Sequence, residues 1–435
     1  MAASVMKIAR RLETFERLDK TRQDDFLKDR LFRLIGHAKK FAPYWANRLG
    51  AWAPHGESPE SILGAVPILS RADLQSKHAE IRAQFPGRNK MKIAPTSSSG
   101  STGIPITTEH LSALHQPMQY AIRLLEARWH EIDPKKPVGF LSSKVTDDEC
   151  LPTLMPFGWF GPTATGFSRC IKGREYPELY DYCAGKKPAY LVSGPPMFSG
   201  LARHAIASGR RDVRPEKVLT YGSAVTEETR ELVREGLNAK IVDRYSTEET
   251  GMIGVQCPRH DHFHLLSPTA FVEIVDEHDA PCSVGKPGRV LVTNMQSFAM
   301  PLIRYDIGDV AEWGEPCNCG ITLPVIAKLW GRSNFFVTNP DGRKVYIKIF
   351  FRDFDDIVGL QEYRFVLHRN AVVVAHLKVA EPSNELANTV TERIQGVFGY
   401  PYPVKVQFED RIDWGSSWKK ENFAVSDEAP PGERS

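Results

Sequence analysis

Hydrophobic residues recur at every third or fourth position through residues 5–50, which is the spacing of one face of an α-helix. Ala42-Pro43 ends the second run of this pattern, because the residue before a proline disfavours the helical conformation. A further helix is expected after Ser70, whose hydroxyl would cap it in a capping box with Asp73. A long helical pattern then extends from His110 to Ile132. The pattern predicts a helical N-terminal region.

Beyond that region, short apolar runs alternate with amphipathic stretches. Strands are expected at residues 137–141, 189–192, 217–222 and 239–245, with a helix at residues 226–237 capped by Thr226. This β–α–β succession predicts a mostly parallel sheet with ligands at the carboxyl ends of its strands. Residues 270–275 and 289–293 alternate instead like paired antiparallel strands, which predicts an additional β subdomain.

The pattern changes again after Gly331-Arg332. The last hundred residues predict a hairpin, an amphipathic helix and another strand, at residues 363–368, 371–376, 385–397 and 404–408. We therefore predict an α/β protein with a large N-terminal domain over residues 1–331 and a small α+β domain over residues 332–435. The tail, residues 426–435, is rich in proline, glycine and acidic residues and is predicted to be disordered.

Composition narrows the class of protein. A chain with 42% hydrophobic and 25% charged residues is neither disordered nor of low complexity. A net charge of +3 gives no reason to expect nucleic acid or a membrane as a partner. There is no long apolar run and no apolar core in the basic N-terminus, so we expect a cytoplasmic protein. Seven cysteines, an odd number, argue against a disulfide framework.

A stretch rich in hydroxyl groups and glycine, residues 97–105, is the first candidate for chemistry. Glycine lets backbone N–H groups turn toward an anion, and serine and threonine add hydroxyl donors. Such a loop is suited to phosphate oxygens, but the same composition is typical of a flexible linker. The residues alone leave both interpretations open. The candidate phosphate-binding residues are Ser98, Ser99, Gly100, Ser101, Thr102 and Gly103.

Five further segments follow this loop along the chain, and together with it they form a recognisable series of motifs. They are Tyr221-Gly222-Ser223-Ala224, Tyr245-Ser-Thr-Glu-Glu249-Thr-Gly251, Arg304-Tyr-Asp-Ile-Gly-Asp309, Gly331-Arg332 and Lys419. The order resembles the adenylate-forming superfamily, and within it the phenylacetate–coenzyme A ligase group, over essentially the whole chain. The resemblance implies a large N-terminal adenylation domain and a small, mobile C-terminal lid domain.

The resemblance also implies a role for each segment. The serine- and glycine-rich loop would hold the β- and γ-phosphates of ATP, and Gly222, Ser223 and Ala224 would border the adenine. Tyr245 would pack on the adenine, and Glu249 would hold Mg²⁺. Asp309 would accept hydrogen bonds from both ribose hydroxyls, a role that suits a carboxylate. Arg332 would contact the nucleotide at the hinge, and Lys419 would be the catalytic lysine.

Some positions depart from the family's pattern. Ser246 replaces a glycine and Glu248 replaces a threonine or serine. Phe335 stands where the hinge motif has an aspartate. Trp418 replaces the glycine before Lys419, and Lys420 is a neighbouring candidate for the same role. These departures bear mainly on the domain rotation that thioester formation uses in this family.

Cysteine and histidine residues suggest a structural zinc site. Cys317 and Cys319 lie in a tight turn, and the segment from Cys257 to His264 offers one more cysteine and three histidines. Two cysteines from one turn with a cysteine and a histidine from another complete a tetrahedral set. Members of the family have similar segments, and His264 aligns with the family's histidine. His260 and His262 are alternatives.

The function implied by the resemblance is ATP-dependent activation of a carboxylic acid, aryl or arylacetic, as an acyl-adenylate, with transfer to the thiol of coenzyme A. Trp129, Phe140, Trp159 and Phe160 would suit an aryl acid, but equally suit core packing. Transfer to an amine or to a carrier-protein thiol is one alternative. A non-catalytic nucleotide-binding homologue is another. The oligomeric state is open, with a homodimer as one option.

Overall fold

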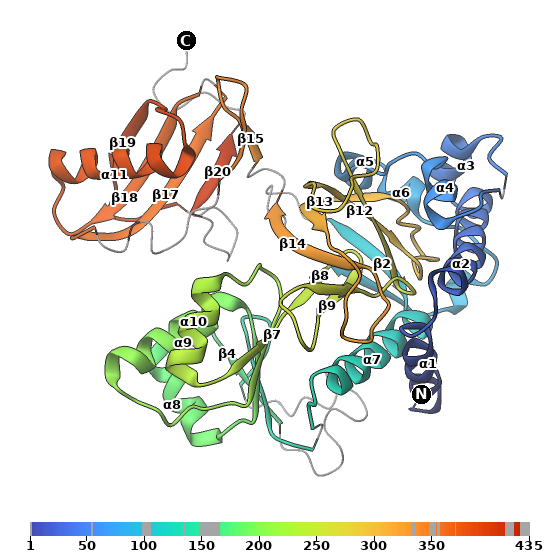
Figure 1. Cartoon of the computed structure of the whole chain (residues 1–435), viewed down its shortest axis with the longest axis horizontal. Coiled ribbons are helices and arrows are strands. Elements are labelled where there is room, and N and C mark those ends of the chain that lie inside the picture. Colours follow the sequence, from blue (N-terminus) through green and yellow to red (C-terminus); the bar gives the residue numbers. More distant parts are fainter. Residues whose placement is uncertain are drawn as a thin grey trace. The chain divides into compact units, whose positions relative to one another are not determined.

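The computed structural model describes residues 2–53, 55–97, 106–133, 135–147, 166–332, 336–347, 354, 357–369, 371–413 and 422–426. The chain divides into two compact units (Figure 1). The first comprises residues 1–98 and 106–330, and the second contains Gly331–Ser435. Among the described residues, none of the helices combines the length and the apolar character needed to cross a bilayer.

The N-terminal region is helical, as predicted. Its helices are α1 (Ala2–Phe15), α2 (Lys20–Phe41), α3 (Pro43–Leu49), α4 (Pro59–Gly64), α5 (Arg71–Ser76) and α6 (His78–Ile81). Helix α2 ends just before Ala42, and Pro43 opens α3. Ser70 caps α5 by accepting a hydrogen bond from the Asp73 N–H at 3.0 Å, while its hydroxyl donates to the Asp73 carboxylate at 2.9 Å. The expected N-cap at Ser70 is therefore confirmed, with the Asp73 carboxylate bound to the Ser70 hydroxyl in place of the backbone N–H of a capping box.

A short antiparallel hairpin connects these helices to the rest of the unit. It consists of β1 (Ile93–Ser97) and β2 (Thr107–Leu111), preceded by a 3₁₀ turn, η1 (Arg88–Lys90). Helix α7 (Ser112–Trp129) follows directly. The predicted helical start at His110 is wrong by two residues, because His110 and Leu111 pair with β1.

A five-stranded parallel sheet forms one half of the first unit. Its order is β4-β3-β5-β6-β7, with β3 (Val138–Ser142), β4 (Gly166–Cys170), β5 (Tyr190–Ser193), β6 (Lys217–Thr220) and β7 (Lys240–Val242). Three helices, α8 (Tyr176–Lys186), α9 (Pro195–Ser208) and α10 (Glu227–Leu237), share one core with it (Figure 1). Ala127 and Ile132, at the end of α7 and just after it, share a second core with this sheet. This is the predicted α/β layer.

A seven-stranded sheet forms the other half, and each neighbouring pair with a described register is antiparallel. Its order is β11-β12-β13-β14-β10-β9-β8, with β8 (Arg244–Thr247), β9 (Gly251–Gln256), β10 (Phe263–Leu265), β11 (Ala270–Val275), β12 (Gly288–Asn294), β13 (Tyr305–Trp313) and β14 (Val325–Arg332). The N-terminal helices share its core. The β11–β12 pair confirms the expected antiparallel strands.

The single strand predicted at residues 239–245 is wrong. The chain leaves the parallel sheet at Val242 and enters the antiparallel sheet at Arg244. Asp243 lies at this change of sheet. Its carboxylate accepts hydrogen bonds from the Thr220 hydroxyl of β6 at 2.5 Å and from the Arg244 N–H of β8 at 2.8 Å. Both sheets are therefore tied to one residue.

The second unit is a small α+β fold. A two-stranded sheet, β15 (Phe336–Thr338) and β16 (Lys344–Tyr346), precedes a four-stranded sheet of order β19-β18-β17-β20. Its elements are β17 (Leu360–His368), β18 (Val373–Val379), α11 (Asn384–Phe398), β19 (Val404–Phe408) and β20 (Phe423–Ser426). The hairpin, helix and strand expected here are confirmed. Ser426, the first residue of the predicted tail, ends β20, and residues 427–435 lie outside the described part.

Candidate functional site

The predicted phosphate-binding residues Ser98, Ser99, Gly100, Ser101, Thr102 and Gly103 lie outside the described residues, so the structure describes only their flanks. β1 and β2 are paired up to Ser97 and Thr107, whose hydroxyl oxygens are 2.8 Å apart. The segment therefore connects the two strands of a hairpin.

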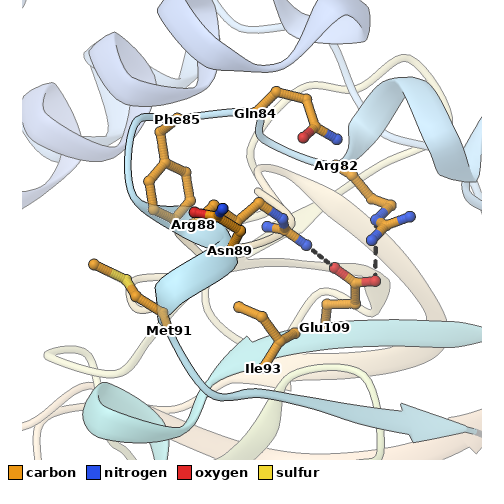
Figure 2. A pocket seen from close by; sticks show the side chains of 8 residues that line it. All are labelled: Arg82, Gln84, Phe85, Arg88, Asn89, Met91, Ile93 and Glu109. Atoms are coloured by element: carbon orange, nitrogen blue, oxygen red, sulfur yellow. Dashed lines mark hydrogen bonds and ion pairs between the residues drawn. The ribbon is translucent and has the colours of Figure 1, made fainter.

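Two arginines hold the base of that hairpin beside a cavity of about 600 Å³ (Figure 2). Arg82 and Arg88 both pair with the Glu109 carboxylate of β2, Arg82 with an N–O distance of 3.0 Å. Arg88 also donates to the carbonyls of Ala83 at 3.1 Å and Ala299 at 2.8 Å. Because these contacts are internal, we interpret the cluster as an anchor for β2.

Replacing Glu109 by glutamine is expected to loosen this anchor. Two guanidinium groups would lose their shared anion in a partly buried site, which costs about 1–3 kcal/mol of folding stability. Urea unfolding measures this loss, and Glu80→Gln, on the exposed surface of α6, is the matched control. Equal stability of the two variants would contradict an anchoring role.

The predicted adenine-pocket segment follows β6 at the carboxyl edge of the parallel sheet, the edge at which sheets of this type bind ligands. Gly222 has a φ of +84°, a conformation that glycine adopts without strain. The Tyr221 ring stacks on Phe140 with 5.9 Å between ring centroids. Gly222 and Ser223 are exposed and Ala224 is half-buried, so the turn is open to a ligand.

Tyr245 and Asp309 come from different strands and meet. Tyr245 lies in β8 and Asp309 in β13, 64 residues further along the chain, and both are buried. The tyrosine hydroxyl lies 3.0 Å from the Asp309 Oδ2 and donates a hydrogen bond to it. The two motifs assigned by resemblance to adenine and ribose are thus in direct contact.

Glu249 lies in the turn between β8 and β9 and is buried. The Thr247 hydroxyl accepts from the Thr250 N–H at 3.0 Å, and the Asn294 side chain donates to the Thr250 carbonyl at 3.3 Å, which fixes the turn. The Glu249 carboxylate faces Arg71, with 3.5 Å between its Oε1 and the arginine Nη1. The sequence analysis missed Arg71, because nothing in a single sequence pairs positions so far apart.

Glu248, one of the departures from the family's pattern, points elsewhere. Its carboxylate pairs with Lys144 at 2.9 Å, and both side chains are exposed. The two adjacent glutamates therefore have different environments, and the buried Glu249 is the better candidate for a metal ligand.

A buried ion pair supports the strand that carries Tyr245. Arg244 donates from Nε and Nη2 to the two carboxylate oxygens of Glu126 in α7, at 2.5 and 2.6 Å. Both side chains are almost completely buried. This bidentate pair joins α7 to β8 and was also missed by the sequence analysis.

Of the other predicted residues, four have no described side chain and a fifth, Trp129, lies in the core. Arg332 is the last residue of β14, and Lys419, Trp159 and Phe160 lie outside the described residues. Trp129 is buried and donates its indole N–H to Glu16 at 2.8 Å, so it belongs to the core.

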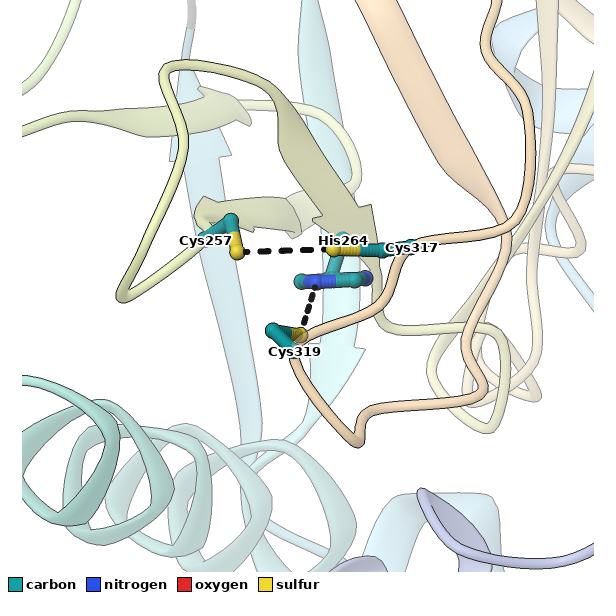
Figure 3. A group of neighbouring side chains, drawn as sticks. All are labelled: Cys257, His264, Cys317 and Cys319. Carbon is teal, nitrogen blue, oxygen red and sulfur yellow. Dashed lines mark hydrogen bonds between the residues drawn. The ribbon is translucent and has the colours of Figure 1, made fainter.

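Three cysteines and a histidine form a compact cluster (Figure 3). The ligand atoms of Cys257, His264, Cys317 and Cys319 all lie within 4.8 Å of one another. The Cys257 and Cys317 sulfurs are 3.8 Å apart, and the His264 Nε2 lies 3.2 Å from the Cys319 sulfur. Two thiolates bound to one tetrahedral zinc at about 2.3 Å lie roughly 3.8 Å apart, so the donor set fits that metal.

The surroundings of the cluster also suit a metal. The second ring nitrogen of His264 lies 3.4 Å from the Leu323 carbonyl, an arrangement typical of ligating histidines. Burial raises the pKa of the Cys319 thiol to about 12 and lowers the pKa of His264 to about 4. A bound divalent cation stabilises the thiolates that burial disfavours. His260 instead contacts Asn318 at 2.9 Å, and neither it nor His262 is in the cluster.

No known protein-family profile matches the chain. A curated relative, the phenylacetate–coenzyme A ligase of Thermus thermophilus, is 32% identical over 135 residues. The match covers 29% of this chain and 30% of the relative, so it spans less than a third of the relative's length.

Several solved structures are similar over much more of the chain. 2-Hydroxyisobutyryl-CoA ligase in the postadenylation state, in complex with R3-HIB-AMP, has a TM-score of 0.70 and 18% identity, over 95% of this chain and 91% of that one. The same ligase in complex with 2-HIB-AMP and CoA in the thioesterification state has a TM-score of 0.62 and 19% identity, over 95% and 92%. ATP-bound MatB from Rhodopseudomonas palustris has a TM-score of 0.51 and 16% identity, over 76% and 66%. The chain therefore has the fold of the acyl-CoA ligases of the adenylate-forming superfamily.

Proposed function

We propose that this chain is an AMP-forming ligase that activates a small carboxylic acid and transfers the acyl group to coenzyme A. The observation that carries the proposal is the hydrogen bond between Tyr245 and Asp309, which joins the motifs assigned to adenine and ribose. Solved ligases of this fold in complex with acyl-AMP and with CoA support it, as does the partial match to a phenylacetate–coenzyme A ligase.

In the first step, a carboxylate oxygen of the acid attacks the α-phosphorus of ATP. The bond from that phosphorus to the bridging oxygen breaks, and pyrophosphate leaves with the bonding electrons, so that acyl-AMP remains. Asp309 accepts from the ribose hydroxyls, and the Tyr245 hydroxyl fixes the orientation of its carboxylate. The open turn at Gly222 borders the adenine. Glu249 is the candidate ligand for Mg²⁺, which supplies neutralisation of the phosphate charge.

In the second step, the thiol sulfur of coenzyme A attacks the acyl carbon. The bond between that carbon and the AMP phosphate oxygen breaks, AMP leaves, and the thiol proton passes to solvent. Lys419 acts in the first step, where its ammonium group stabilises the charge that develops at phosphorus. The small C-terminal domain then moves to allow the second step.

The cysteine cluster is assigned to structural zinc within the same proposal. Cys257, His264, Cys317 and Cys319 supply four donors, and a closed four-donor set leaves no position for substrate. The zinc would join the β9–β10 hairpin to the β13–β14 connection and would take no part in the reaction.

The proposal is tested by pyrophosphate release with ATP, Mg²⁺ and a panel of aryl, arylacetic, hydroxylated and dicarboxylic acids, with and without coenzyme A. Release that depends on one acid, with a thioester formed when coenzyme A is added, is the expected result. Pyrophosphate release without a thioester would indicate that an acceptor other than coenzyme A takes the acyl group in the second step. Absence of release across the panel would refute adenylation.

Replacing Tyr245 by phenylalanine tests the contact on which the proposal rests. The ring remains, but the hydrogen bond to Asp309 is lost, so we expect the KM for ATP to rise about five- to tenfold, the value of one such bond at roughly 1 kcal/mol. The KM for the acid should change little. An unchanged KM for ATP would show that the hydrogen bond between Tyr245 and Asp309 does not contribute to nucleotide binding.

A further inference from the structure

Arg71 opens helix α5, where it faces Glu249. Its Nη1 lies 3.5 Å from the glutamate Oε1, and the side chains are 25% and 10% exposed. This separation is that of an ion pair without a hydrogen bond. The guanidinium group is therefore held near the candidate metal ligand, with its donors still available.

The Nε atom of Arg71 provides a second reason to expect a bound anion. This atom is buried, and it makes no hydrogen bond with the residues that the structure describes. A buried donor without a partner is energetically unfavourable, and each such group in a native protein requires an explanation. A bound anion would satisfy it.

The backbone before Arg71 is fixed by the strand that carries Asp309. Leu69 forms a parallel bridge to Tyr305 of β13, its N–H donating to the Arg304 carbonyl at 3.1 Å and its carbonyl accepting from Asp306 at 3.0 Å. Arg304 in turn donates to the Val66 carbonyl at 2.8 Å. Arg71 is thus positioned by the same strand that positions the proposed ribose ligand.

We propose that Arg71 is a phosphate-binding residue of this site, which rests on the proposed function. Its guanidinium group pairs with Glu249 in the free protein and with phosphate oxygens of ATP in the complex. Glu249 would hold a Mg²⁺ ion that neutralises the phosphates, and Arg71, 3.5 Å from Glu249, would then lie near the same phosphate oxygens. The planar fork of donors matches phosphate geometry.

Calorimetric titration of the whole chain with ATP and with AMP, in Mg²⁺, tests this assignment without knowledge of the acid. Arg71→Met is expected to weaken ATP binding about ten- to a hundredfold, the value of one or two charge-assisted hydrogen bonds. AMP binding should stay within about twofold, because AMP lacks the outer phosphates. Arg71→Lys, which keeps the charge but not the fork, should fall between the wild type and Arg71→Met. Arg33→Met, at an exposed pair on α2, is the control.

Several outcomes would overturn the inference. Equal loss of ATP and AMP affinity would indicate a structural role, and loss of neither would exclude phosphate contact. Wild-type protein that binds no ATP would refute the proposed function itself. If the wild type binds ATP and Arg71→Met binds it equally well, this inference is refuted and the proposed function stands.

Discussion

Replacing Cys317 by serine is expected to remove bound zinc and to lower the midpoint of thermal unfolding by roughly 10 °C or more. The cluster joins two connections of the antiparallel sheet, and its four donors lie within 4.8 Å of one another. Without a metal, these four donors, two buried and two half-buried, would be held together with no bond that compensates for their desolvation. The free energy of metal binding would therefore be lost from the free energy of unfolding.

The measurement combines metal analysis of the purified protein with a thermal melt before and after chelation. Cys170→Ser, at a cysteine outside the cluster, is the matched control and should keep both zinc and stability. His264→Ala should behave like Cys317→Ser, whereas His262→Ala should retain the metal. Protein that contains no zinc and is unaffected by chelators would refute the site.

Replacing Glu126 by glutamine is expected to lower the free energy of unfolding by about 3–5 kcal/mol, because it leaves a buried guanidinium group without its anion. Arg244 has both carboxylate oxygens of Glu126 as partners, at 2.5 and 2.6 Å. Arg123 adds to the effect, since burial and the nearby Arg244 lower its pKa to about 10. Removal of the Glu126 carboxylate would leave the repulsion between the buried Arg244 and the half-buried Arg123 without the nearby anion that offsets it.

Urea unfolding of the whole chain measures this loss as a shift of the midpoint at constant slope. Glu248→Gln is the matched control, because it removes the same charge from an exposed pair worth about 0–1 kcal/mol. The double variant Glu126→Gln with Arg244→Met should recover much of the stability. A loss of the same size in the control and in Glu126→Gln would contradict the role assigned to the buried pair.

Local signals predicted most of the fold. Ser70 and Thr226 cap their helices as expected, because an N-cap depends only on a side chain and the backbone a few residues away. The apolar alternation at residues 270–275 likewise predicted β11. The change of sheet at Asp243 could not be predicted, since it depends on the Thr220 hydroxyl from another strand.

The residues of the candidate site likewise divide into those predicted from the sequence and those that were not. Tyr245, Glu249 and Asp309 were found by resemblance, because each lies in a short contiguous motif. Arg71 and the partners Glu126 and Arg244 have no motif, and only the folded chain brings them to the site. His264 was chosen among three histidines by resemblance, and the structure places it in the metal cluster.

The junction between the first helices and the β13–β14 connection bears on how the chain folds during synthesis. The Thr322 hydroxyl lies 2.8 Å from the Glu16 and Leu18 carbonyl oxygens and accepts from the Gln23 amide at 2.9 Å, across about 300 residues of sequence. At about 5–20 residues per second, the ribosome needs roughly 15–60 s between making the first partners and the last. Until β13 and β14 are made, the amphipathic helices α1 and α2 have only an incomplete sheet to cover. Nascent chains halted before residue 300 should therefore expose apolar surface, bind chaperones and be readily cleaved by protease.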